Sequence, residues 1–494
     1  MKKFAFSALL ALGVVALMAP PVAFAADDEK PFKIHGEVRT RLEYTNNTQD
    51  FTDQDASTAP FDSDDGAGYF PYRIRIAAEG QFTDDVSGWI EFQNTGVFGE
   101  QGLVNQFLGT SDQTNARRFN DGKSLTQMYQ AYINMGKLWS DNFSLRIGRQ
   151  EVVLGNEFIF GDEDFYTGIS HDAIVGMWDL KSVDITAWYA RTVEDSVYQY
   201  GLFPTDGGAQ DVPPDLVVIN PSAFNMEHFG AYVTFGVGKD KSQDVDVYIV
   251  NVNDRAFGGR FQTLGARYGR DGWDKGGLVW NIEYAIQMGE FASELVSGFD
   301  ESAGGSAAEG LIGWNFKGDK NVHRVFAKME MATGEQDGDD PTTPLVDEDG
   351  DDEFEGFVPL FGEVHNRTGH GDWFRVQHDP TGLGGAFISG GLEAWALGYT
   401  GMFGEKHEIG AQYWDYSTET DAYTFVAPGA PKNPTDLGKA FDIWYGYKYS
   451  KNVAIEASYS SLSPGDALTS DGDPTTSDPD DTVERLYANL RLRF

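Results

Sequence analysis

The sequence predicts a single transmembrane antiparallel β-barrel of about 18 strands, with long loops at one end and short turns at the other. Two observations support this fold class. Apolar and polar residues alternate with a period of two along many segments, and the connections between these segments are alternately long and short. A barrel strand needs about 9–11 residues to cross a bilayer, and in lipid the sheet must close because every backbone group has to be paired.

The first 25 residues have the pattern of a secretory signal peptide. Lys2 and Lys3 precede the apolar run Phe4–Met18, and a small-residue cleavage site ends at Ala25. The apolar run is too short for a transmembrane helix, which needs about 20 apolar residues. We therefore expect residues 26–494 to form the barrel.

The alternating segments follow one another along the rest of the chain. Their predicted starts are near Phe32, Phe70, Val86, Ser124, Asn142, His171, Ser182, Glu227, Gln243, Arg260, Gly276, Gly305, Asn321, Gly391, Glu405, Leu437, Lys451 and Val483. The last segment, 483–494, ends in Phe494 after alternating apolar residues. It resembles the C-terminal assembly signal of bacterial outer-membrane proteins, so we interpret it as the closing strand and expect contact with the barrel-assembly machinery.

The connections fall into two classes by length. Short turns are expected near 83–85, 139–141, 181, 239–242, 271–275, 318–320, 404 and 450. Long loops are expected at 46–69, 99–123, 151–170, 192–226, 289–304, 333–390, 418–436 and 463–482, while 251–259 lies on the long side but is short. Short turns face the periplasm and long loops the exterior in such barrels. The predicted location is therefore the cell outer membrane, in contact with lipid and lipopolysaccharide.

The composition excludes several classes of protein. Cysteine is absent, so the chain has no thiolate metal site, disulfide or cysteine nucleophile. The net charge of −40 argues against nucleic-acid binding. No G-x-S-x-G, HExxH or P-loop motif is present, so we do not expect an enzyme.

Some stretches resemble a known family, the alginate-export family of Gram-negative outer-membrane porins. The first is NFSLRIGRQEVVLGNEFIFGDEDFYTGISHDAI, in which the matching residues are Leu145, Arg146, Gly148, Arg149, Gln150, Gly155, Gly161 and Asp172. The stretch Phe357–Phe374, with its Gly369-His370 step, is similar to a long late loop of that family. The resemblance implies a passive outer-membrane channel.

The less apolar face of each strand is assigned to the lumen, because a charge facing lipid at mid-membrane costs about 2–4 kcal/mol. The predicted pore-lining residues are Arg39, Arg41, Arg73, Arg75, Arg146, Arg149, Arg485, Arg491, Arg493, Glu37 and Glu79. Arg149 has the parity of the apolar face, and we place it at the mouth because it ends a strand. Barrel closure brings the last strand beside the first, so the arginines of three strands should share one wall.

This arginine wall has two interpretations. Guanidinium groups match the geometry of carboxylates and phosphates, and a row of arginines can select anions in a pore. Alternatively, the arginines pair with lumenal glutamates such as Glu37, Glu43 and Glu79 and satisfy one another. The sequence leaves both interpretations open.

The long loops are strongly acidic and could bind Ca²⁺ through hard oxygen ligands. Asp347, Asp349 and Asp351 are the candidate ligands, although solvated charge that keeps the loops soluble is the alternative. His365, His370 and His378 lie in the longest loop, where we expect solvated histidines, with a metal site as the alternative. His171 and Asp172 are adjacent in a strand and should point to opposite faces.

The predicted function is passive passage of small polar or anionic solutes, carbohydrates and carboxylates included. No cofactor is expected beyond the possible loop Ca²⁺. On length alone, the predicted constriction is either loop 99–123, which holds Arg117 and Arg118, or loop 151–170. The alternative is a plugged scaffold or adhesion barrel that binds cations or surface partners through its acidic loops.

Overall fold

The computed structural model describes residues 32–46, 67–98, 125–162, 164–165, 167–193, 226–238, 243–254, 259–273, 276–292, 300–334, 353–358, 360–363, 365–374, 391–419, 435–465 and 482–494. The signal peptide, the whole of loop 99–123 with Arg117 and Arg118, and Asp347, Asp349 and Asp351 lie outside these residues. Within this part of the chain, no helix is long and apolar enough to cross a membrane.

Eighteen long antiparallel strands form the wall, as the alternation predicts, and each starts within two residues of its expected position. They are β1 (Phe32–Asn46), β3 (Pro71–Thr83), β4 (Val86–Val97), β5 (Leu125–Met135), β6 (Phe143–Gln150), β7 (His171–Asp179), β8 (Val183–Val193), β9 (Met226–Val237), β10 (Gln243–Asp254), β11 (Gly259–Arg270), β12 (Gly277–Ala292), β14 (Ser306–Lys317), β15 (Asn321–Ala332), β17 (Leu392–Phe403), β18 (His407–Ser417), β19 (Asp436–Lys448), β20 (Val453–Pro464) and β21 (Val483–Arg493).

Three short strands lie in the long loops and were not predicted. β2 (Ala67–Tyr69) pairs with the end of β1, and β13 (Asp300–Ala303) pairs with the end of β12. β16 (Glu353–Phe354) pairs with β13 in parallel. Elements of two to four residues are too short to show an alternation, so the sequence pattern could not reveal them.

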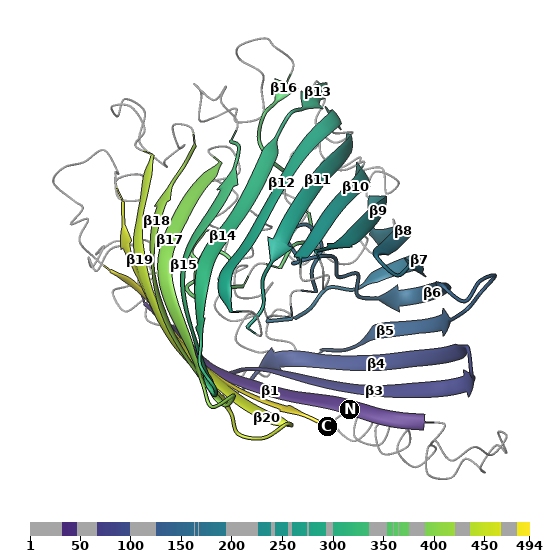
Figure 1. Ribbon diagram of the computed structural model, residues 1–494, viewed down its shortest axis with the longest axis horizontal. Coiled ribbons are helices and arrows are strands. Elements are labelled where there is room, and N and C mark those ends of the chain that lie inside the picture. The colour runs from purple at the N-terminus through teal and green to yellow at the C-terminus, as the bar shows by residue number, and fades with distance from the viewer. Residues whose placement is uncertain are drawn as a thin grey trace, which may run out of the picture.

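The sheet closes between its first and last strands. β1 pairs with β3 on one side and with β21 on the other, from Glu37 opposite Arg493 to Asn46 opposite Glu484. The amide of Gly36 donates to the carbonyl of Phe494 at 2.8 Å, and Figure 1 shows the C-terminal end beside β1. The predicted closing strand is therefore confirmed.

The outer surface of the wall is apolar. Its exposed side chains include Ile34, Leu42, Ile74, Ile90, Ile133, Ile174, Ile282, Ile312, Trp314, Val325, Trp395, Leu397, Ile409, Phe441, Ile443, Ile455 and Leu490. The residues between them are largely charged or polar and are buried on the inner face, such as Arg39, Arg73 and Glu283. A continuous apolar belt around a polar interior is suited to a lipid bilayer, which places the barrel in the outer membrane.

Two loop segments fold into the lumen instead of extending outward. The first inserted segment, 151–170, follows β6 and the second, 355–374, follows β16; Figure 1 shows coil crossing the interior. Gly161 donates its amide to the Phe361 carbonyl at 2.7 Å, and Phe361 donates to Ile159 at 3.0 Å. The prediction that 151–170 enters the barrel is confirmed, whereas entry of 355–374 was not predicted.

The inserted segments carry much of the apolar core, which therefore lies inside the barrel. Phe160 packs with ring centroids 5.2 Å from Phe361 and 5.3 Å from Trp188. Further buried members of this core are Leu154, Phe158, Phe357, Leu360, Trp373, Phe374, Trp414 and Tyr416. These contacts fix both segments against the wall and narrow the lumen.

Candidate pore constriction

The arginines of β1, β3 and β21 form one wall, as predicted from barrel closure. Arg39 lies opposite both Arg73 on β3 and Arg491 on β21. Glu37 lies opposite Arg75 and Arg493 in the same two strands. Alternation then places every second residue on the inner face, so the arginine wall comprises Arg39, Arg41, Arg73, Arg75, Arg485, Arg491 and Arg493.

Asp164 of the first inserted segment contacts this wall. Arg73 Nη2 donates to Asp164 Oδ1 at 2.5 Å, and Arg75 Nη1 donates to the same oxygen at 3.0 Å. Arg493 Nη2 donates to Asp164 Oδ2 at 3.3 Å, and Arg491 Nη1 lies 3.6 Å from that oxygen. One loop carboxylate is therefore shared by four guanidinium groups.

The backbone around Asp164 adds further contacts to the wall. Arg73 Nη1 donates to the Asp164 carbonyl at 2.7 Å, and Arg39 also donates to it. Arg41 donates to the carbonyl of Phe165 at 2.9 Å, and its guanidinium lies 3.9 Å from the centre of the Phe165 ring. The inserted segment is thus attached to the wall through backbone as well as side chain.

The electrostatics of Asp164 follow from these neighbours. Burial raises the pKa of this carboxyl, but Arg73, Arg75 and Arg39 outweigh burial and hold the pKa well below its usual range. Asp164 is therefore ionised at any physiological pH. Its negative charge offsets part of the positive charge of the arginine wall.

Other carboxylates pair with the remaining arginines. Glu37 accepts from Arg73 Nη2 at 2.6 Å and from Arg493 Nε at 3.0 Å. Arg485 donates to Glu43 at 2.9 Å and to Asp372 of the second inserted segment at 2.8 Å. Mutual pairing thus describes most of the wall, and its most exposed side chains are Arg491 at 36% and Arg493 at 56%.

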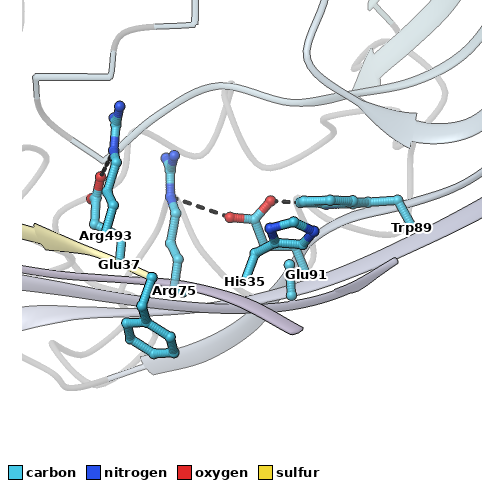
Figure 2. A pocket seen from close by; sticks show the side chains of 9 residues that line it. His35, Glu37, Arg75, Trp89, Glu91 and Arg493 are labelled. Carbon is cyan, nitrogen blue, oxygen red and sulfur yellow. Dashed lines mark hydrogen bonds and ion pairs between the residues drawn. The ribbon is translucent and has the colours of Figure 1, made fainter. Parts of the chain in front are cut away.

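A pocket of about 230 Å³ lies beside Arg493 at the periplasmic end of the wall. Figure 2 shows Arg493, Arg75 and Glu91 projecting from the same side of the sheet. His35 stacks on Trp89 with ring centroids 5.0 Å apart, and Trp89 donates to Glu91 at 3.1 Å. The pocket therefore presents a partly exposed guanidinium next to aromatic surface.

A second cavity, of about 290 Å³, lies between the inserted segments and the strands opposite the arginine wall. Its lining includes Glu309, Glu330, Lys328 and Arg367. Arg367 forms an ion pair with Glu309 and donates to the Asn156 carbonyl at 2.6 Å. Arg367 thus joins both inserted segments to β14.

The other predicted pore-lining residues divide between the two faces. Arg146 is on the inner face, with its guanidinium 4.7 Å from the centre of the Tyr132 ring. Glu79 pairs with His35 at 3.0 Å near the periplasmic end. Arg149 does not turn into the mouth; it is exposed on the outer face and donates to Asp172 at 2.7 Å.

Arg149 stays on the outer face because a charged partner on the neighbouring strand lies beside it. Arg149 shares the exposed face of β6 with Ile147, and Asp172 shares the exposed face of β7 with Ile174. The ion pair between Arg149 and Asp172 compensates both charges on the outer face. Arg149 therefore points to the face that the alternation along β6 assigns to it. His171 is buried on the other face from Asp172, as predicted.

Two histidines of the longest loop, His365 and His370, are not solvated, contrary to our expectation, while His378 lies outside the described residues. His365 and His370 lie in the second inserted segment, where His370 is only 2% exposed. The ring of His365 stacks on Phe165 with centroids 3.3 Å apart. Burial lowers the pKa of both imidazoles, so both are neutral near pH 7. Loop composition alone could not indicate this, because it does not show which loops fold inward.

Sequence reasoning also missed Asp164, Glu151 and Asp372. Glu151 accepts from the hydroxyl of Tyr129 at 2.7 Å and lies 3.8 Å from Arg75. Burial raises its pKa to about 7, against smaller opposite effects of Tyr129 and Arg75. All three carboxylates lie in coil, where no period-two pattern marks the inward direction.

No family model and no curated protein matches this chain. Solved structures of Pseudomonas aeruginosa outer-membrane proteins do match. OpdK has a TM-score of 0.52 at 9% identity, covering 94% of this chain and 99% of its own. OccK2 (OpdF) has a TM-score of 0.51 at 10% identity, covering 94% of this chain and 98% of its own. OccK8 (OprE) has a TM-score of 0.53 at 11% identity, covering 95% of this chain and 100% of its own. The chain therefore has the fold of these outer-membrane porins.

Proposed function

We propose that the protein is a passive outer-membrane channel for small anionic solutes, in particular carboxylates. The observation that carries the proposal is the seating of the Asp164 carboxylate among four arginines. It indicates that the wall can coordinate a carboxylate, because paired guanidinium donors match its two oxygens. Arg491 and Arg493 remain partly exposed, so an entering anion can reach them.

The solved structures of similar fold support the choice of solute. OccK2 was crystallised with glucuronate and OpdK with vanillate, and both compounds carry a carboxylate. Sequence identity to these porins is about one residue in ten, so their ligands are a guide to solute class only. Carbohydrates are included among the proposed solutes only when they carry a carboxylate.

Several predictions from the sequence stay predictions. The alginate-export resemblance rests on short sequence stretches, and passage of alginate has no support beyond them. Loop Ca²⁺, lipopolysaccharide contact and recognition of Phe494 by the assembly machinery also rest on sequence alone. That the protein is not an enzyme stays a prediction.

Uptake into proteoliposomes tests the proposed function. We expect glucuronate to enter faster than glucose through the wild-type barrel, because the guanidinium groups offset the cost of dehydrating the anion. In the double variant Arg491→Ala/Arg493→Ala, the glucuronate-to-glucose ratio should fall roughly fivefold, as expected for loss of about 1 kcal/mol of screened attraction. Arg149→Ala is the matched control, since its guanidinium lies on the outer face. An unchanged ratio in the double variant would contradict the proposal.

A plugged scaffold or adhesion barrel is the second candidate. The apolar core formed by the two inserted segments inside the lumen favours it, since packed Phe158, Phe160 and Trp373 exclude water. This candidate predicts no uptake of either solute by a correctly folded barrel. Folding is checked on a denaturing gel, where a folded barrel migrates differently before heating than after heating.

A further inference from the structure

Three potential metal ligands converge on one hydroxyl inside the barrel. Tyr487 of β21 donates its hydroxyl proton to Glu456 Oε1 of β20 at 3.0 Å. The same hydroxyl oxygen lies 3.0 Å from His370 Nδ1 and 3.3 Å from His365 Nε2. The ligand atoms of His365, His370 and Glu456 all lie within 4.8 Å of one another.

The cluster offers more hydrogen-bond acceptor atoms than the Tyr487 hydroxyl has protons to donate. His365 Nδ1 lies 2.8 Å from Asp372 Oδ2, so in the neutral ring Nδ1 carries the proton and Nε2 accepts. The single Tyr487 proton can serve only one acceptor among Glu456 and the two imidazoles. A cation bound by the three ligand atoms would serve all three acceptors at once. His370 Nε2, on the other side of that ring, is buried without a hydrogen-bond partner among the described residues.

The surroundings of His365 also fit a metal site. Asp372 is buried and accepts from His365 Nδ1, from Arg485 Nη1 at 2.8 Å and from the Asn366 amide at 2.9 Å. A carboxylate held in this way behind a histidine fixes the ring orientation and directs Nε2 toward a metal.

We propose that His365, His370 and Glu456 bind one divalent transition-metal ion of the Zn²⁺ and Cu²⁺ class. Two imidazoles and one carboxylate favour these ions over Ca²⁺ and Mg²⁺, which prefer oxygen ligands only. The Tyr487 hydroxyl is placed to supply a fourth ligand. Metal bonds of about 2.1 Å bring tetrahedral ligands to roughly 3.4 Å from one another, so the cluster closes slightly on binding.

The position of this site gives the metal a structural consequence. His365 and His370 belong to the second inserted segment, whereas Glu456 belongs to wall strand β20. A bound ion therefore links the segment to the wall beside the constriction. This inference concerns the internal site and does not depend on whether the barrel conducts.

Calorimetric titration with Zn²⁺ tests the proposal. The mature barrel, free of any histidine tag and stripped with a chelator, is titrated in buffer that contains excess Ca²⁺ and Mg²⁺ to occupy acidic loops. We expect one Zn²⁺ per barrel. Affinity should fall at least about 100-fold in His370→Ala and about 10–100-fold in Asp372→Asn, which removes the carboxylate behind His365. Cu²⁺ should give an electron paramagnetic resonance spectrum with nitrogen coupling that His370→Ala reduces.

Controls separate this site from adventitious binding and from misfolding. Glu456→Gln removes a ligand charge but preserves shape, so a folded variant with affinity at least tenfold weaker supports the proposal. His323→Ala is the matched control, because His323 Nδ1 lies 2.7 Å from the Tyr399 hydroxyl in a histidine–tyrosine pair elsewhere on the wall. Absence of Zn²⁺ binding, or equal affinity in wild type and Glu456→Gln, would overturn it.

Discussion

At the scale of single residues, Asp164 has the largest expected influence on the charge of the lumen. Its carboxylate forms ion pairs with four arginines of the wall, Arg73, Arg75, Arg491 and Arg493. Because the inserted segment brings this charge to a row of arginines, Asp164 both anchors the segment and reduces the positive potential that an anion would meet.

Replacing Asp164 by asparagine should therefore increase anion selectivity. Asp164→Asn removes one negative charge while retaining side-chain shape, so we expect the anion-to-cation permeability ratio to rise roughly two- to fivefold at low salt, where screening is weak. Reversal potentials in planar bilayers measure this ratio. Asp172→Asn, which changes a carboxylate on the outer face, is the control. A fall in the ratio for Asp164→Asn would contradict the assigned electrostatic role.

Glu151 should make selectivity depend on pH. Burial raises its pKa to about 7, so the carboxyl is mostly neutral at pH 6 and mostly ionised at pH 8. Anion selectivity should decrease between these values as negative charge appears 3.8 Å from Arg75. The free energy of unfolding should also decrease as pH rises. Glu151 favours the folded state at low pH, and that contribution is lost as pH rises from about 4.5, the ordinary pKa of glutamate, through 7.

Reversal potentials measured between pH 6 and 8 check this prediction. The pH step should disappear in Glu151→Gln. Glu484→Gln is the matched control, because Glu484 also accepts a hydrogen bond from a tyrosine, Tyr459, but lies at the start of β21. If the step persists in Glu151→Gln, another group is responsible for it.

The sequence allowed the arginines of the wall and their strand partners Glu37 and Glu43 to be predicted, but not their partners in the loops. Arg39, Arg73 and Arg491 lie in strands, where alternation fixes the inward face and closure fixes the neighbours. Asp164 and Asp372 lie in coil, and their contacts depend on how a loop folds back into the lumen. Arg149 shows the limit within strands as well, since a salt bridge to Asp172 allows a charge on the outer face.

At the scale of elements, the two inserted segments determine how much of the lumen remains open. Phe160 is fully buried and contacts residues of both the wall and the second inserted segment. Gly168 adopts a φ of +85°, and a Cβ there would meet Arg75 and Tyr129. The first segment therefore lies against the wall at Phe160 and at Gly168.

Truncating Phe160 should loosen both inserted segments. Phe160→Ala is expected to cost about 3–5 kcal/mol of packing, since it leaves a cavity at the centre of the lumenal core. Single-channel recordings should show larger and noisier conductance, and the inserted segments should become more sensitive to protease. Phe441→Ala on the outer face is the control, and we expect little change there. Unaltered conductance in Phe160→Ala would mean that the core does not limit the lumen.

The elements of the wall were predictable because each long strand separates lipid from the lumen and so carries a two-residue period. The fate of the long loops was only partly predictable. Segment 151–170 was suspected on length alone, and segment 355–374 gave no comparable signal. Its apolar residues Phe357, Leu360 and Trp373 have neither helical nor strand periodicity.

At the scale of the whole molecule, closure explains both the chain terminus and the arginine wall. β21 pairs with β1 and so seals the sheet, which leaves no unpaired strand edge in lipid. The same pairing brings Arg485, Arg491 and Arg493 beside Arg39 and Arg41. A single topological feature thus supplies the barrier to lipid and the cluster of charge that we propose for solute passage.

The most direct test of the central claim is the reversal potential of single refolded barrels under a KCl gradient. We predict open steps that are anion-selective and that shift toward cations in Arg39→Ala and Arg491→Ala, because each substitution removes positive charge from the arginine wall. Cation-selective steps in the wild-type barrel would contradict the role of that wall and would indicate that the acidic loops determine the ion selectivity. A folded barrel without conductance would contradict the channel itself and support the plugged scaffold.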